Sequence, residues 1–205
     1  MKKIAFVMIA LVAITLPVFA EKSGKEAYEI SCKACHGDNG AGGKDFGGGP
    51  NLTILKEKYV RAQFKVIREG KRKGPGTVNM LKTLKDSKLT EKEIEAALVY
   101  AIALPEAKSN HKGIGDKNLG MAKYMICATC HGQKGEGYTN TAIPAPRLAG
   151  QADFYIVDQV KSFKAGHRGN DTVGGMQMKA MSNILVTEAD MKNVAAYIKS
   201  LGKKK

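Results

Sequence analysis

Hydrophobic side chains recur at helical spacing in two stretches of the chain, one ending before Pro105 and the other before Gly202. Each stretch follows a threonine, Thr90 or Thr187, with an acidic residue three positions later, which is the pattern of a capping box. The apolar positions then share one helix face; they are Ile94, Ala97, Leu98, Ala101 and Ile102, and Met191, Val194, Ala195, Ile198 and Leu201. No segment alternates at strand period for any length, so we predict an all-α fold.

The chain contains two copies of one unit. Thr90 and Thr187 are 97 positions apart, and Cys32 and Cys127 are 95 apart. Such self-similarity at a nearly fixed offset indicates tandem repeats. Each copy is expected to run as helix, cysteine motif, Gly-rich and Pro-rich loop, middle helices, Met-bearing loop and final helix. We predict an N-terminal domain over 21–104, a C-terminal domain over 117–205 and a polar, turn-rich linker over 105–116.

The first twenty residues have the pattern of a secretory signal peptide. A basic start is followed by an apolar run from Ile4 to Leu16, and small residues precede a cleavage site near Ala20. An uncleaved membrane anchor is the alternative, but the run is short and broken by Pro17. We predict export to the periplasm and cleavage after residues 1–20.

The charge is strongly basic, with 33 lysines and arginines against 19 acids. Without residues 1–20 the balance is 31 minus 19, or +12. A basic surface suits nucleic acid, anionic lipid or an acidic protein. An exported protein meets little nucleic acid, and the lysines are scattered. We expect redox protein partners with acidic docking surfaces and no nucleic acid; peripheral membrane association and simple solubilisation are the alternatives.

All four cysteines belong to two Cys-x-x-Cys-His motifs. This is the pattern for covalent haem attachment, in which the thiols bind the haem vinyl groups and the histidine binds iron. Two matches with no cysteine left over make zinc or dithiol chemistry a poor alternative. The sequence predicts two haem c groups, attached at Cys32, Cys35, Cys127 and Cys130, with His36 and His131 as iron ligands.

The sixth iron ligand decides whether each iron is closed for electron transfer or open for chemistry. In the first unit Met80 is the only methionine between residue 21 and Met121, and it lies in a Gly-Pro-Gly loop 44 residues after His36. We assign it as the ligand, with core packing as the alternative. In the second unit three methionines are within reach, and a shift of 97 from Met80 lands on Gln177. The repeat therefore does not choose among Met176, Met178 and Met181.

Other residues near the motifs have weaker signals. His111 and His167 are alternative ligands that we expect to be exposed. Pro50 and Pro146 follow the motif histidines by 14 and 15 positions, where a carbonyl can accept the Nδ1 proton of the imidazole. Tyrosines next to the first and final helices of each unit are expected to pack where those helices cross; they are Tyr28, Tyr100, Tyr124 and Tyr197.

The second half carries the string Pro146-Arg147-Leu148-Ala149-Gly150-Gln151, followed by Tyr155, Gln159, Phe163, Gly166 and Arg168, a Met-rich loop and Ala195-Ala196-Tyr197-Ile198. In these residues the chain resembles the bacterial di-haem cytochrome c4 family. The first half is looser, with Gly49-Pro50-Asn51-Leu52 in place of the proline-arginine string. The resemblance implies two tandem class I cytochrome c domains related by a pseudo-twofold axis, each wrapped around one covalently bound haem. It also implies His/Met ligation, facing haem propionates and, by distance from the final helix, Met178 as the second methionine ligand.

The resemblance favours an electron carrier over an enzyme. Such a protein transfers electrons between respiratory-chain partners, toward a terminal oxidase, and a quinol-cytochrome c oxidoreductase is another candidate partner. One alternative is the di-haem electron-accepting subunit of a flavocytochrome c sulfide dehydrogenase-like complex, with a flavoprotein partner. A lesser alternative is a di-haem redox enzyme, such as a thiosulfate dehydrogenase or a peroxidase, which usually has a cysteine ligand or an open iron.

Overall fold

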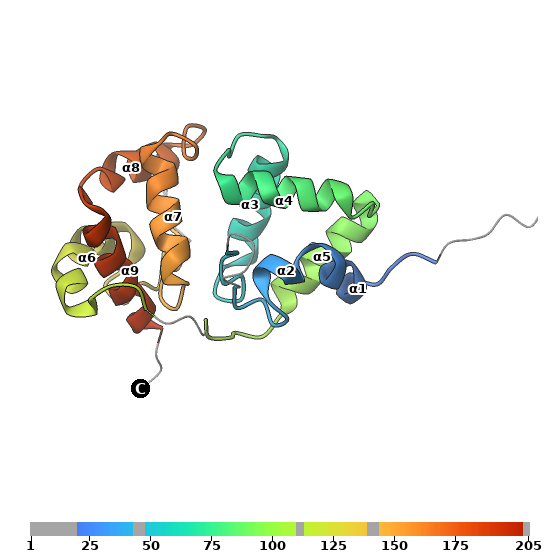
Figure 1. Cartoon of the computed structure of the whole chain (residues 1–205), viewed down its shortest axis with the longest axis horizontal. Helices are drawn as coiled ribbons and strands as arrows, with labels where there is room; N and C mark the ends of the chain where they lie inside the picture. The colour runs from blue at the N-terminus through green and yellow to red at the C-terminus, as the bar shows by residue number, and fades with distance from the viewer. Residues whose placement is uncertain (1–19, 43–47, 110–112, 139–143, 203–205) are drawn as a thin grey trace, which may run out of the picture.

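The computed structural model describes residues 20–42, 48–109, 113–138 and 144–202. Within these ranges the chain folds into helices and contains no named strand, which confirms the all-α prediction. The predicted signal peptide lies outside the described residues except for Ala20. The helices form two groups that lie next to each other (Figure 1). They are α1 (Gly24–Ser31), α2 (Lys33–His36), α3 (Glu57–Arg68), α4 (Pro75–Asp86), α5 (Glu91–Ala103), α6 (Lys117–His131), α7 (Asp153–Lys164), α8 (Val173–Ser182) and α9 (Glu188–Leu201).

Each half is built on a crossing of its first and last long helices, α1 with α5 and α6 with α9. A tyrosine pair packs at each crossing, as predicted. The ring centroids of Tyr28 and Tyr100 are 5.4 Å apart, and those of Tyr124 and Tyr197 are 5.2 Å apart. The apolar faces predicted for the final helices turn inward, and their central residues are buried.

A glycine lets the two helices approach closely at the second crossing. A Cβ at Gly120 would lie 2.0 Å from the backbone oxygen of Asn193, which cannot move independently of α9. We therefore expect Gly120→Ala to lower the free energy of unfolding by about 1–3 kcal/mol. Gly113→Ala is the control, because a Cβ at that exposed position would lie 3.8 Å from its nearest neighbour, Asp153 Oδ2, and it should change the free energy of unfolding by less than about 0.5 kcal/mol. Denaturant unfolding of both variants checks this; equal changes would contradict the close approach.

The predicted caps of the final helices are present. Thr90 and Glu93 form a capping box at the start of α5, and Thr187 and Asp190 form one at the start of α9. Glu93 is also bound by Lys22, whose backbone nitrogen lies 3.0 Å from Glu93 Oε1. These hydrogen bonds, first those from Thr90 and then those from Lys22, lower the pKa of Glu93 from 4.5 to about 2.

The lowered pKa of Glu93 predicts a contribution to acid stability. Because the native state favours the ionised carboxylate, this contribution is complete above pH 4.5 and is lost as the pH falls toward about 2. Glu93→Gln removes the titrating group, so its stability should fall less than that of the parent over this interval. Glu95→Gln, on the same helix in an exposed ion pair with Arg61, is the control. Urea unfolding at several pH values measures both; an unchanged slope in Glu93→Gln would contradict the assignment.

The expectation that the methionines lie in loops is wrong. Met80 belongs to α4, and Met176, Met178 and Met181 belong to α8. In the first half the Gly-Pro-Gly sequence starts a helix, with Gly74 at the N-cap and Pro75 in the first turn. Proline fits there because its fixed φ is already helical and its missing N–H has no partner in the first turn anyway.

The segment between α5 and α6 is bound to both halves. Arg147 donates two hydrogen bonds to the Glu106 carboxylate, at 2.8 and 2.9 Å. Asn51 Nδ2 donates to the Ala107 carbonyl oxygen at 2.8 Å. The backbone nitrogen of Asn51 in turn donates to Gln151 Oε1 at 2.6 Å. The helix ends at Ala103 and Lys117 leave room for the predicted linker, while the domain boundaries themselves stay a prediction.

None of the helices within the described ranges combines the length and the hydropathy that a bilayer crossing requires. This statement does not extend to residues 1–19.

Candidate functional site

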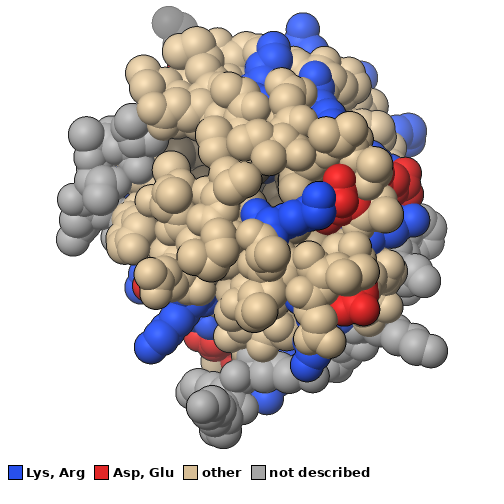
Figure 2. All heavy atoms as spheres, turned by 90° about the vertical axis from the view of Figure 1, so that its left-hand side faces the viewer, with Lys and Arg blue, Asp and Glu red and all other residues tan. Residues whose placement is uncertain are grey.

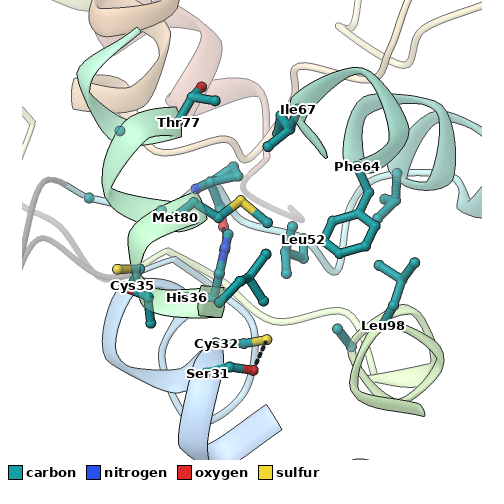
Figure 3. A pocket seen from close by; sticks show the side chains of 18 of the residues that line it. Ser31, Cys32, Cys35, His36, Leu52, Phe64, Ile67, Thr77, Met80 and Leu98 are labelled. Atoms are coloured by element: carbon teal, nitrogen blue, oxygen red, sulfur yellow. Dashed lines mark hydrogen bonds between the residues drawn. The ribbon is translucent and has the colours of Figure 1, made fainter. Parts of the chain in front are cut away.

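The first cysteine motif opens onto an apolar cavity. Cys32, Cys35 and His36 come from the α1–α2 segment, and Met80 reaches the same cavity from α4 (Figure 3). The walls are largely hydrophobic side chains from α3, α4, α5 and the loop before α3. They include Leu52, Val60, Phe64, Ile67, Leu84, Ile94 and Leu98.

The imidazole of His36 is oriented by a backbone carbonyl. His36 Nδ1 lies 3.2 Å from the Pro50 carbonyl oxygen, and because a carbonyl only accepts, Nδ1 carries the proton. The lone pair is then on Nε2. Burial lowers the pKa of His36, so the ring is neutral and able to bind a metal. Gly49 permits this arrangement, because a Cβ there would lie 2.8 Å from His36 Nδ1.

Three of the four cysteine thiols lie in surroundings that disfavour the thiolate form. All four are free of disulfides. Burial raises the pKa of Cys32 and Cys35, and it raises the pKa of Cys127 to about 11. Reactive and metal-binding cysteines instead have lowered pKa values. Across the described part of the chain, no cluster of three or more His, Cys, Asp or Glu side chains could hold a metal ion.

These residues fit a covalently attached haem. The cavity has apolar walls for a macrocycle and two neutral thiols for thioether bonds. It also has a neutral imidazole whose Nδ1 is hydrogen-bonded to the Pro50 carbonyl oxygen. Met80 adds a thioether sulfur to the same cavity. Imidazole and thioether together are the donor set of cytochromes c.

The second motif repeats the geometry of the first. His131 Nδ1 lies 2.9 Å from the Pro146 carbonyl oxygen, as the spacing predicted. Burial, opposed by this hydrogen bond and assisted by the charge of Arg168, lowers the pKa of His131. The Tyr124 hydroxyl donates to the Gly132 carbonyl oxygen at 2.7 Å. This bond links the end of α6 to a tyrosine in the core of the second half. Both motif histidines are therefore neutral and held through Nδ1.

The three candidate methionines all lie in α8, and they differ in their position along this helix. Met178 is the sixth residue of α8, as Met80 is the sixth residue of α4. Met178 is half-buried, whereas the side chains of Met176 and Met181 are 53% and 38% exposed. When the starts of α4 and α8 are aligned, Met80 corresponds to Met178, which is an offset of 98 residues. The offset of 97 between the final helices instead placed Gln177 opposite Met80.

Of the two histidines considered as alternative ligands, the structure describes only one. His167 is exposed in the loop after α7. His111 lies outside the described residues.

Sequence reasoning missed that the second half contributes to the first cavity. Tyr155, Asp158 and Gln159 of α7 line it, together with Arg72 of the first half. A signal existed, because the first half also carries tyrosine, glutamine and arginine at positions 59, 63 and 72, each 96 positions before its counterpart. This offset of 96 lies between the offsets of 95 and 97 that relate the cysteine motifs and the final helices.

Comparison with known families identifies both halves. The family model described as cytochrome c matches residues 119–202, and that described as cytochrome C oxidase, cbb3-type, subunit III matches residues 19–100. Cytochrome c-552 of Acidithiobacillus ferridurans is 32% identical over 85% of this chain and 76% of its own length. Cytochrome c4 of Azotobacter vinelandii is 28% identical over 89% of this chain and 88% of its own length.

Solved structures share the fold. The Acidithiobacillus ferrooxidans cytochrome c4 structure matches with a TM-score of 0.62 and 28% identity, covering 83% of this chain and 98% of that one. A thiosulfate dehydrogenase (TsdBA) from Marichromatium purpuratum matches with a TM-score of 0.66 and 24% identity. The match covers 86% of this chain but only 39% of the thiosulfate dehydrogenase. The similarity to that enzyme therefore bears on the fold alone.

Proposed function

The chain belongs to the di-haem cytochrome c4 family, and from that premise we propose that it carries electrons between respiratory-chain proteins, toward a terminal oxidase. Membership means that it binds two haem c groups covalently and takes part in electron transfer. The observation that carries the proposal is the pairing of His36 with Met80 around one apolar cavity. An iron that is bound by both a histidine and a methionine has no free coordination position for a substrate. This favours an electron carrier over an enzyme.

We assign the haem-binding residues as follows. Cys32 and Cys35 attach the first haem, and Cys127 and Cys130 attach the second. His36 with Met80 and His131 with Met178 would bind the two irons. When bound, each haem supplies a one-electron iron couple. The protein holds the imidazoles through the carbonyl groups of Pro50 and Pro146, and largely apolar side chains line the cavity around His36.

The surface supports docking to an acidic redox partner in the periplasm. Figure 2 shows that the outer face of the C-terminal half has lysines and arginines at several places within a larger uncharged area, with fewer acidic side chains. A basic surface attracts an acidic partner over a distance that salt controls, because the Debye length falls from about 30 Å at 0.01 M to about 8 Å at 0.15 M.

Salt dependence tests the proposed docking. The rate at which a terminal oxidase oxidises the reduced protein should fall steeply as ionic strength rises from 0.01 to 0.15 M. Oxidation by a neutral small-molecule oxidant is the control and should change little. Stopped-flow absorbance follows both reactions; a flat rate with the oxidase would contradict docking through the basic surface.

A second candidate function is the acceptance of electrons from a thiosulfate dehydrogenase. It is favoured by a relative named thiosulfate dehydrogenase electron acceptor from Thiomonas intermedia, which is 28% identical over 82% of this chain. Mixing the oxidised protein with thiosulfate and such a dehydrogenase separates the cases. Reduction only when the dehydrogenase is present supports the acceptor role, whereas reduction by thiosulfate alone indicates an enzyme. Copurification with a flavoprotein would instead support the flavocytochrome alternative.

A further inference from the structure

The peptide group between Pro50 and Asn51 is hydrogen-bonded at both of its polar atoms. Its carbonyl oxygen lies 3.2 Å from His36 Nδ1, which donates to it. Its N–H donates to Gln151 Oε1 at 2.6 Å. His36 belongs to the first half of the chain and Gln151 to the second. One peptide group of the first half therefore connects the imidazole of the first site with a side chain of the other half.

The orientation of the Gln151 side-chain amide follows from the groups around it. Gln151 Oε1 also accepts from the backbone nitrogen of Ala152 at 3.0 Å, and Gln151 Nε2 donates to the Asn51 carbonyl oxygen at 3.1 Å. If the amide were turned around, its NH₂ group would face two N–H donors and its oxygen would face a carbonyl oxygen. The oxygen of Gln151 is thus the atom that accepts from the Asn51 N–H.

Little solvent reaches these hydrogen bonds. Asn51 is fully buried, and Gln151 is only 2% exposed. In surroundings of low polarity a hydrogen bond is electrostatically stronger than in water, and consecutive hydrogen bonds polarise one another. The bond from Asn51 to Gln151 and the bond from His36 to Pro50 are consecutive in this sense, because they share one peptide group.

The two hydrogen bonds strengthen each other. Resonance couples the two ends of a peptide group, so an acceptor at the N–H increases the negative charge on the carbonyl oxygen. A more negative Pro50 oxygen is a better acceptor for the Nδ1 proton of His36. A stronger hydrogen bond at Nδ1 in turn makes the imidazole a better electron donor to a metal at Nε2.

Gln151 affects the first site only through this peptide group. His36 and Pro50 line the first cavity, whereas Gln151 is not among the described residues that line it. The Gln151 side chain is also uncharged, so it exerts no long-range field of the kind that a lysine or a glutamate would exert.

We propose that Gln151 lowers the reduction potential of the first haem by strengthening the hydrogen bond between His36 and the Pro50 carbonyl oxygen. The inference rests on the proposed assignment of His36 as an iron ligand, and it does not depend on the redox partner. A better electron donor stabilises the oxidised iron, which has one positive charge more than the reduced iron. Gln151 is a positioning residue, since it does not touch the iron or its ligand.

Potentiometric titration of the Gln151→Met holoprotein tests this inference. Methionine is similar in length to glutamine but does not offer the amide oxygen. The midpoint potential of the first haem should therefore rise, while that of the second haem, in the same molecule, should not change. An unchanged first potential, or an equal rise at both haems, overturns the proposal.

Nuclear magnetic resonance of the reduced, diamagnetic protein gives the second readout. The Nδ1 proton of His36 is identified by its contacts with Pro50, and that of His131 by its contacts with Pro146. In Gln151→Met the His36 proton should move upfield, because a weaker hydrogen bond leaves it more shielded, while the His131 proton keeps its position. An unmoved His36 proton overturns the proposal even if the potential changes. Spectra at partial reduction show which haem each potential belongs to.

Thr53→Val is the matched control in the same buried contact between the halves. The Thr53 hydroxyl donates to Asn51 Oδ1 at 2.7 Å and accepts from the backbone nitrogen of Ala107 at 2.9 Å. Its removal loosens the Asn51 side chain and the predicted linker, but the Asn51 N–H keeps its acceptor on Gln151. Both potentials should stay at the parental values. A rise of the first potential equal to that of Gln151→Met would indicate general loosening and overturn the proposal.

Gln151→Glu keeps the test decisive if Gln151→Met loses haem. The carboxylate of this variant accepts from the Asn51 N–H more strongly than an amide does. The His36 Nδ1 proton should then move downfield and the first potential should fall, opposite to the effects of methionine; an upfield shift or no shift overturns the proposal. Haem content and the low-spin spectrum report separately on the proposed function. Two low-spin haems in every variant, with an unmoved His36 proton, contradict only the role of Gln151.

Discussion

Replacing Cys127 and Cys130 together by serine is expected to give a protein with one haem per chain and a C-terminal half that does not fold. Each half is predicted to be under about a hundred residues long, a size at which the apolar core is thin. In the first half the cavity that fits the haem lies among the core helices. The haem is therefore a large part of each core, and without thioether bonds the C-terminal half loses it.

Two measurements on the double variant check this result. Haem quantified per chain should fall from two to one, and circular dichroism should show the loss of helix from α6 to α9. Thr129→Ala is the control within the same motif, since it keeps both cysteines and removes only a hydroxyl, which donates to the Ile126 carbonyl oxygen at 2.8 Å and to Cys130 Sγ at 3.8 Å; this variant should keep both haems. A near-native spectrum from Cys127→Ser/Cys130→Ser would show that the protein core is stable without the second haem.

Replacing Met178 by leucine is expected to open the second iron. The thioether ligand is lost while the volume of the side chain is kept, so the fold survives. The potential of that haem should fall, because methionine ligation raises it, and the reduced protein should bind carbon monoxide at one of its two irons. Met80→Leu should have the same effect at the first haem.

The other two methionines of α8 supply the matched controls. Met176→Leu and Met181→Leu remove a thioether from exposed positions of the same helix and should leave both haems low-spin. Paramagnetic resonance of the oxidised proteins and carbon monoxide titration of the reduced ones compare all four variants. Carbon monoxide binding by Met176→Leu or Met181→Leu, with Met178→Leu unaffected, would reassign the ligand.

Local signals predicted the parts of the fold that depend on local physics. Thr90 and Thr187 each begin a capping box, and an apolar helix face follows each one. These signals predict where the two final helices start, and both helices are present as expected. The contacts of the Pro50 and Pro146 carbonyl groups agree with the prediction, because each proline follows its histidine in the same loop, by 14 and 15 residues. Met80 was misplaced because Pro75 was interpreted as a loop residue, although proline is equally common in the first turn of a helix.

The contacts between the halves could not be predicted in the same way. Gln63 and Gln159 resemble ordinary polar positions on a helix surface, and only the approach of the two halves makes them half-buried acceptors for arginines of the opposite half. The first half also lacks the proline-arginine string, so its similarity to the second half looked weaker than it is. Periodicity describes one helix at a time and contains no information about which helix of the other half it meets.

The lining of the first cavity by α7 has a consequence for biogenesis. A chain that emerges amino terminus first presents Cys32 and Cys35 well before Tyr155 and Gln159. If haem is attached in the order in which the motifs appear, the first half receives its cofactor while one wall of the cavity is still missing. The early intermediate then has a haem edge open to solvent, and the arrival of α7 closes it. Maturation of the first centre is thus completed by the synthesis of the second.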